Sequence, residues 1–248
     1  MQKTILECVV GSTLHGTAVN DGLEDLDLMA ISVEGLNQVA GFNQCDTWTH
    51  RTKPQGVRSE AGDVDYVAYG LRKYLTLATK GNPTVLLALF AGAEHTREIT
   101  GAGRDLRALA PQIVSKQCYM PFRGYMRQQH ERLLGLRGQR NVTRPELVEK
   151  YGFDTKYAAH VVRLGLQGCE LLNTGRLTLP MREEERQLCV KIRTGGFSLA
   201  EVSEQIIAAE QALDVAYAVS SLPDKPDLAA VESWMLKTYS VYWSTGLV

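Results

Sequence analysis

The stretch of sequence that decides the fold reads Gly11-Ser12-Thr13-Leu14-His15-Gly16-Thr17-Ala18-Val19-Asn20-Asp21-Gly22-Leu23-Glu24-Asp25-Leu26-Asp27-Leu28-Met29-Ala30-Ile31. An apolar run typical of a strand, residues 5–10, leads into its Gly-Ser pair. After the pair we expect a short helix near residues 14–18, and then a strand in which aspartates alternate with apolar residues. The stretch therefore predicts strand, Gly-Ser turn, short helix and strand, in that order.

Asp25 and Asp27 occupy alternate positions of the second strand, so both carboxylates project from one face while Leu26 and Leu28 enter the core. Two carboxylates a few ångströms apart repel each other, and a divalent cation offsets that repulsion. Because all the ligand atoms are oxygen, Mg²⁺ or Mn²⁺ is favoured. An isolated Asp-x-Asp more often marks a solvated strand edge, so the prediction depends on the turn that precedes it.

Gly11 and Ser12 form that turn. A Gly-Ser turn that leaves a strand and opens a short helix presents backbone N–H groups and a hydroxyl, which bind phosphate oxygens. His15 lies in the same turn, where it either donates a hydrogen bond to a phosphate or caps the turn, and the sequence leaves both roles open. Beside two metal-binding carboxylates, this turn suits a metal-bound triphosphate.

The combination of strand, Gly-Ser pair, short helix and hydrophobic-flanked Asp-x-Asp resembles the signature of the DNA polymerase beta nucleotidyltransferase superfamily. The resemblance implies a third carboxylate from a later strand. The Val- and Tyr-rich segment 62–69 offers Asp63 and Asp65 on one face. We favour Asp65 because the strand holds an inner position better, and Asp63 stays the alternative.

The same resemblance implies a role for each of these residues. Asp25 and Asp27 hold two Mg²⁺ (or Mn²⁺) ions, and Asp65 shares the second ion and accepts the proton of the attacking hydroxyl. Gly11 and Ser12 bind the β- and γ-phosphates of the nucleotide.

Three further blocks are similar to a narrower group, the predicted bacterial and phage nucleotidyltransferases linked to RNA repair. They read Leu71-Arg72-Lys73-Tyr74-Leu75, Lys80-Gly81-Asn82-Pro83-Thr84-Val85-Leu86 and Tyr151-Gly152-Phe153-Asp154-Thr155-Lys156-Tyr157-Ala158-Ala159-His160-Val161-Val162-Arg163-Leu164. The similarity runs from about residue 5 to residue 193. It also implies an acidic residue in the helix after Asn82-Pro83, where this chain has Leu87.

One polar face of the helix predicted in the third block carries Lys156, His160, Arg163 and Gln167 at helical spacing. Cations in line on one face suit a triphosphate or a nucleic-acid backbone. A structural role for His160, with Lys156 and Arg163 paired to neighbouring acids, is the alternative. We expect Lys156, His160 and Arg163 to contact substrate.

Composition is that of a globular protein: 248 residues, 44% hydrophobic and 22% charged. No window is apolar enough to span a bilayer, no signal peptide is present, and the five cysteines are scattered, so we expect a cytoplasmic protein with no membrane partner. Net charge is −1, yet residues 116–163 contain ten Lys or Arg against four Asp or Glu. This basic segment predicts contact with a polyanion, and a solvated helix surface is the alternative.

We expect an α/β (α+β) fold: a small mixed-sheet nucleotidyltransferase core in residues 1–110, followed by a mainly helical substrate-binding domain in residues 111–248. Strands are predicted at 4–10, 25–33 and 63–69, and the turn-rich region 34–61 has room for another. Helices are predicted at 71–80, 84–90, 115–136, 153–173, 183–192, 199–220 and 228–242.

Together these features predict a metal-dependent nucleotidyltransferase that moves an NMP from an NTP to an acceptor hydroxyl and releases pyrophosphate. The basic segment and the resemblance favour an RNA or tRNA 3′ end as acceptor. Nucleotidylation of a protein or a small molecule, and a non-catalytic nucleotide- or RNA-binding protein, stay as alternatives. The sequence leaves the base, the need for a template and the oligomeric state open.

Overall fold

The computed structural model describes residues 2–19, 25–42, 44–54, 62–135 and 144–247. Residues 20–24 of the quoted stretch lie outside this part of the chain. Arg137 and Arg140 of the basic segment lie outside it as well.

Five strands form one mixed sheet in the order β3-β4-β2-β1-β5. Their bounds are β1 (Gln2–Val9), β2 (Leu26–Glu34), β3 (Thr47–Arg51), β4 (Val64–Gly70) and β5 (Thr96–Ile99). The central pair β2 and β4 is parallel, and the other neighbours are antiparallel. The parallel pair matters for the site described below, because it brings Asp27 and Asp65, the second residues of β2 and β4, side by side at one end of the sheet.

Helices connect the strands, and a long helical region follows the last strand. Their bounds are α1 (Gly11–His15), α2 (Leu36–Ala40), α3 (Leu71–Thr79), α4 (Pro83–Phe90), η1 (Ala93–His95), α5 (Gly101–Ala108), α6 (Ala110–Ile113), η2 (Lys116–Cys118), α7 (Tyr119–Leu133), α8 (Pro145–Tyr151), α9 (Thr155–Thr174), α10 (Glu183–Arg193), α11 (Leu199–Val219) and α12 (Leu228–Ser244). The predicted fold class, a mixed sheet followed by a mainly helical region, is confirmed.

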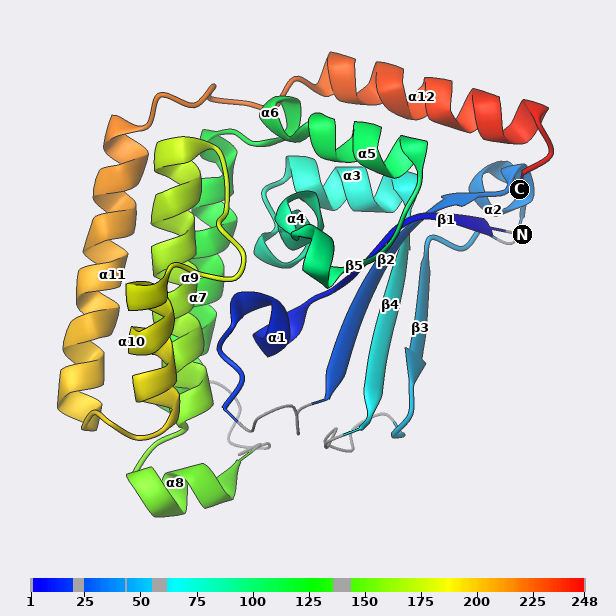
Figure 1. Ribbon diagram of the computed structural model, residues 1–248. Helices are drawn as coiled ribbons and strands as arrows, with labels where there is room; N and C mark the ends of the chain where they lie inside the picture. Colours follow the sequence, from blue (N-terminus) through cyan, green and yellow to red (C-terminus); the bar gives the residue numbers. More distant parts are fainter. Residues whose placement is uncertain (1, 20–24, 43, 55–61, 136–143, 248) are drawn as a thin grey trace.

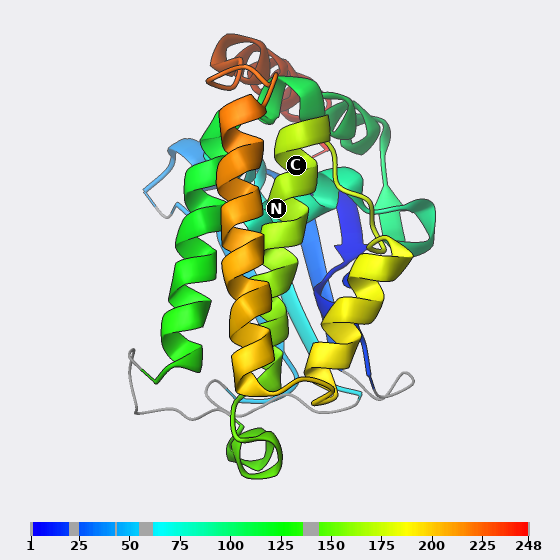
Figure 2. The same ribbon diagram turned by 90° about the vertical axis from the view of Figure 1, so that its left-hand side faces the viewer.

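Two groups of helices lie beside the sheet (Figure 1). The helices α3, α4 and α5 pack against its central strands, and α12 lies beyond them across the top of the molecule in Figure 1. The helices α7, α9 and α11 run side by side, with α10 against α9 (Figure 2). The short helix α1 lies between the sheet and this second group (Figure 1). A single apolar core, which includes Ile31, Leu14 and Val161, connects both groups.

Local signals explain how α4 and α9 are placed. Asn82 caps α4 by accepting from the backbone N–H of Thr84 at 2.9 Å, and Pro83 occupies the first turn, where no N–H is needed. Asp154 caps α9 in the same way, accepting from the N–H of Lys156 at 3.0 Å. Gly168 allows α9 to approach its neighbours, because a Cβ there would lie 2.7 Å from a methyl carbon of Leu213.

Some boundaries differ from the prediction. Asp25 and Asp63 immediately precede β2 and β4 instead of lying inside them, and α1 begins at Gly11 and ends at His15. The predicted ranges do not include β5, α5, α6 and α8, because Gly101, Pro111 and Pro145 can end a helix as readily as begin one. The structure shows these residues in first helical turns, a position that proline tolerates and that Thr100 caps for α5.

The predicted boundary at residue 110 falls at the start of α6, and α12 contacts α3, α6 and β2, on the sheet side of the molecule. The division into two domains stays a prediction. Within the described residues, no helix combines the length and the apolar character that crossing a bilayer requires.

Candidate active site

Three carboxylates meet where β2 and β4 begin. In the parallel register Asp27 lies beside Asp65, and Asp25 directly precedes β2. One oxygen from each of Asp25, Asp27 and Asp65 lies within 4.8 Å of the other two, and all three residues are half-buried. We call this set the acidic cluster.

The β3 strand supplies a partner for Asp65. Arg51 lies opposite Asp65 in the antiparallel register and donates from Nε to Oδ1 at 2.7 Å and from Nη2 to Oδ2 at 3.2 Å. This two-point contact fixes the plane of the carboxylate. Asp63 is bound elsewhere: its Oδ1 accepts from the Thr52 hydroxyl at 2.8 Å, and its Oδ2 lies 3.7 Å from Lys53 Nζ. The geometry therefore brings Asp65, not Asp63, to the other two aspartates.

Gly11 fits tightly against Asp27. Its φ is +68°, a conformation that favours glycine, and a Cβ at this position would lie 2.0 Å from Asp27 Oδ2. The N–H of Val10 donates to the backbone oxygen of Asp27 at 2.9 Å, which holds the turn beside β2. The Ser12 carbonyl accepts from the Thr17 N–H at 2.9 Å, which closes the turn that follows. The predicted phosphate turn and the acidic cluster are thus parts of one site.

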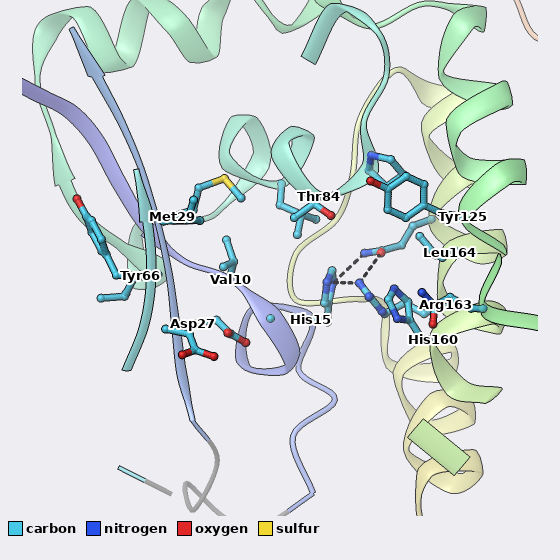
Figure 3. Close-up of a pocket in the computed structure, with 18 of the residues that line it drawn as sticks. Val10, His15, Asp27, Met29, Tyr66, Thr84, Tyr125, His160, Arg163 and Leu164 are labelled. Carbon is cyan, nitrogen blue, oxygen red and sulfur yellow. Dashed lines mark hydrogen bonds between the residues drawn. The ribbon is translucent and has the colours of Figure 1, made fainter. Parts of the chain in front are cut away.

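His15 joins this turn to α9. Its Nε2 accepts a hydrogen bond from the Arg163 guanidinium, and its Nδ1 lies 3.1 Å from the side-chain amide nitrogen of Gln167 (Figure 3). Arg163 Nη1 also donates to Gln167 Oε1 at 3.2 Å. His15 is only 2% exposed. Both ring nitrogens of His15 thus contact α9, which fits the role of holding the turn, and donation to a phosphate stays a prediction.

Burial and positively charged neighbours lower the pKa values of the two histidines beside Arg163, His15 and His160. Burial lowers the pKa of His15 well below its ordinary value, and the positive charge of Arg163 lowers it further. The pKa of His160 is lowered in the same way by burial, with Arg163 and Lys156 adding repulsion. Burial also lowers the pKa of Arg163 to about 10, so it stays cationic at neutral pH. Two neutral histidines thus flank one buried cation.

Two adjoining cavities meet at this site. The larger has a volume of about 450 Å³ and lies between the sheet, α4, α7 and α9. The smaller, about 180 Å³, is bounded by the phosphate turn, α9 and α10. The residues that line both are Gly11, His15, Asp27, His160 and Arg163. Ser12 and Lys156 line the smaller cavity only, and Asp65 the larger only.

The predicted site residues therefore converge, and three further residues join them. Arg51 and Gln129 line the larger cavity, and Arg193 lines the smaller one, where its guanidinium donates to the Thr17 carbonyl. No local motif marks these three residues in the sequence. Leu87, where the resemblance implied an acid, is 5% exposed and lines the larger cavity, so this part of its wall is apolar.

The arrangement fits a divalent cation bound next to a polyanion. Three clustered carboxylates provide the oxygen ligands that Mg²⁺ and Mn²⁺ prefer. Lys156, Arg163 and Arg193 around the smaller cavity provide positive charge beside the phosphate turn.

A protein-family model agrees with this chemistry. A family model described as the RNA repair pathway DNA polymerase beta family (RlaP) matches residues 1–228. No curated protein matches the chain. Among solved structures, the chain is similar to a nucleotidyltransferase-like protein from Exiguobacterium sibiricum 255-15, with 10% sequence identity, a TM-score of 0.31, and coverage of 95% of this chain and 73% of that chain.

Proposed function

The chain belongs to the RNA repair pathway DNA polymerase beta family, and from that premise we propose that it is a metal-dependent nucleotidyltransferase that transfers an NMP from an NTP to an RNA 3′ hydroxyl. The observation that carries the proposal is the fit between Gly11 and the acidic cluster. A module that only bound nucleotides would have no need for three carboxylates packed against its phosphate turn. The proposed products are extended RNA and pyrophosphate.

Each residue of the site has a part in this proposal. Asp25, Asp27 and Asp65 would hold two Mg²⁺ or Mn²⁺ ions, which when bound supply charge neutralisation at the α-phosphorus and activation of the attacking hydroxyl. The Gly11-Ser12 turn binds the outer phosphates through its backbone N–H groups and hydroxyl. Asp65, held in plane by Arg51, receives the proton of the hydroxyl.

The cationic side of the site positions the triphosphate. Lys156, Arg163 and Arg193 line the smaller cavity beside Ser12, so we place the β- and γ-phosphates there. The α-phosphorus then lies at Asp27, which both cavities share. Catalysis in this scheme is mainly positioning and charge neutralisation of an in-line displacement.

The acceptor is the finer part of the proposal. RNA is favoured by the basic segment 116–163, which contains ten Lys or Arg against four Asp or Glu. Cationic side chains of this segment that do not bind the triphosphate would contact the RNA backbone, and this contact should weaken steeply with salt.

An assay with labelled nucleotides tests the reaction and the acceptor together. The protein is incubated with each α-labelled NTP, Mg²⁺ or Mn²⁺ and total RNA, and the products are divided between ribonuclease and protease. We expect label that ribonuclease releases and protease does not. The Asp27→Ala variant should lower turnover far more than tenfold, a loss well above about 1.4 kcal/mol of transition-state stabilisation.

Asp224→Ala is the matched control, because Asp224 is an exposed aspartate that pairs with Lys116 away from the site. It should retain full turnover. If protease released the label instead, the acceptor would be a protein and not RNA. Turnover of the Asp27→Ala variant within tenfold of the wild type would refute the role of the acidic cluster.

A further inference from the structure

The larger cavity extends well beyond the groups that bind metal and phosphate. From Asp27 it reaches past His15 and Arg163 to Thr84, Tyr125 and Leu164, which lie on its far side in Figure 3. Leu164 lies at this far end (Figure 3), and Leu87 also lines the cavity. Apolar walls do not bind a charged triphosphate held at the phosphate turn, but they do bind a flat aromatic base.

Gln129 of α7 lines the same cavity and is 8% exposed. Its Oε1 is fully buried and has no hydrogen-bond partner among the described residues. A buried amide oxygen without a donor costs stability, and such groups are rare in folded proteins. Because Gln129 lines the cavity, a rotation of its side chain that turns Oε1 toward the cavity would let a ligand N–H group satisfy this oxygen.

Tyr125 lies one turn before Gln129 on α7 and lines the same cavity. Its hydroxyl accepts a hydrogen bond from Asn82 Nδ2 at 3.3 Å, and a hydroxyl that accepts one bond still has a hydrogen to donate. The far end of the cavity therefore combines apolar walls with an amide and a hydroxyl. A side-chain amide presents a donor and an acceptor side by side, as does the Watson–Crick edge of every nucleobase.

Resting on the nucleotidyltransferase function proposed above, we infer that the far end of the larger cavity is a nucleobase subsite in which Gln129 binds the Watson–Crick edge of the incoming NTP. Tyr125 supports the base as a second polar contact. A base whose pairing edge is bound by protein cannot pair with a template. The addition is therefore template-independent, and the protein selects the base.

Calorimetry with uncleavable ligands tests the subsite without turnover. The probes are the α,β-methylene analogues of the four NTPs and inorganic tripolyphosphate, each with Mg²⁺. We expect the wild type to bind at least one analogue more tightly than tripolyphosphate. Gln129→Met, which keeps the length of the side chain and removes its hydrogen bonds, should bind that analogue about tenfold more weakly and tripolyphosphate equally well.

Stability separates this role from a structural one. Because the Oε1 atom has no hydrogen-bond partner in the described part of the chain, Gln129→Met should melt at or above the wild-type temperature, whereas the loss of a structural glutamine would lower it. Gln128→Met is the matched control: Gln128 precedes Gln129 on α7 and does not line the cavity, so its analogue binding should be unchanged. Tyr125→Phe should weaken binding of the analogue less than Gln129→Met does.

Equal binding of the preferred analogue by Gln129→Met and the wild type would overturn the subsite, as would a wild type that binds analogues no better than tripolyphosphate. In both cases label transfer to RNA would still support the proposed function. Failure of that function has a different result: neither probe binds the wild type, and no label is transferred.

Discussion

At the scale of single residues, Gly11 connects phosphate binding with metal binding. An alanine at this position must adopt a φ of +68° and place its Cβ 2.0 Å from Asp27 Oδ2. We expect Gly11→Ala to destabilise the protein by more than the roughly 1–2 kcal/mol of the backbone conformation alone, and to abolish transfer. Chemical denaturation and the labelled-nucleotide assay measure the two effects.

Gly62→Ala is the control for backbone strain. Gly62 also has a positive φ, +86°, but no atom of the described residues lies within 4 Å of the position a Cβ would take. This variant should lose about 1–2 kcal/mol of stability and keep its turnover. If Gly11→Ala transferred nucleotide at the wild-type rate, the contact between Gly11 and Asp27 would be irrelevant to the reaction.

The choice between Asp65 and Asp63 provides a second prediction. Asp65→Asn should weaken Mn²⁺ binding and lower turnover strongly, because an amide is a poorer metal ligand and its N–H₂ group clashes with the donors of Arg51. Asp63→Asn should change both little, since Asp63 accepts from Thr52 outside the acidic cluster. Electron paramagnetic resonance titration of Mn²⁺ gives the affinities, and the opposite ranking would exclude Asp65 as the third carboxylate.

The candidate site divides into residues that a sequence reveals and residues that it does not. Gly11, Asp25 and Asp27 are found because a local strand-turn-strand pattern carries them. Arg51 and Gln129 have no such pattern: Arg51 reaches Asp65 through the pairing of β3 with β4, and Gln129 enters the cavity through the packing of α7. Contacts between distant segments depend on register and packing, which sequence periodicity does not specify.

At the scale of elements, the link between α1 and α9 makes stability depend on pH. The folded-state pKa values of His15 and His160 lie below the value of about 6.5 for an unfolded histidine, because both side chains are buried beside Arg163. The unfolded chain therefore binds protons first as the pH falls. The stabilisation is complete above about pH 6.5 and is lost below it, by up to about 1.4 kcal/mol per pH unit for each histidine.

Urea unfolding across that range tests the link. His15→Gln, which cannot be protonated, should show a shallower loss of unfolding free energy between about pH 7.5 and about pH 5.5 than the wild type. His50→Gln alters an exposed residue of β3 and should keep the wild-type slope. A His15→Gln slope equal to that of the wild type would show that His15 gains a proton as readily in the folded state as in the unfolded one.

Sequence periodicity predicts some of the helices and strands well and others poorly. The helices α9, α10 and α11 fall within two residues of their predicted bounds, because each is at least eleven residues long and has polar residues at its start. The helices α5 and α8 were not predicted, because glycine and proline occur both after the end of a helix and in its first turn. The sequence alone does not distinguish these two positions. The four-residue strand β5 is too short to show alternation, and only its pairing with β1 makes it a strand.

At the scale of the whole molecule, α12 stands apart. The family match ends at residue 228, where α12 begins, yet this helix is hydrogen-bonded to the sheet. The buried Glu34, at the end of β2, accepts from the Tyr239 hydroxyl at 2.7 Å and from the Leu71 N–H at 2.8 Å. The Trp243 indole N–H donates to the Glu34 carbonyl at 2.9 Å. One carboxylate thus joins β2, α3 and α12 at the end of β2 remote from the acidic cluster.

This network predicts a variant that affects stability and spares the reaction. Tyr239→Phe removes the hydroxyl that donates to the buried Glu34 carboxylate, and we expect a loss of about 1.5–3 kcal/mol in unfolding free energy, the range for a hydrogen bond to a charged group. Tyr242→Phe, on the same helix and without a hydrogen bond to Glu34, should lose much less. Urea denaturation measures both.

Because Glu34 and Asp27 lie toward opposite ends of β2, the folded Tyr239→Phe protein should bind Mn²⁺ as the wild type does. Weakened Mn²⁺ binding would instead make α12 part of the support for the acidic cluster, and equal stability of the two variants would show that the Glu34 network adds nothing to the fold.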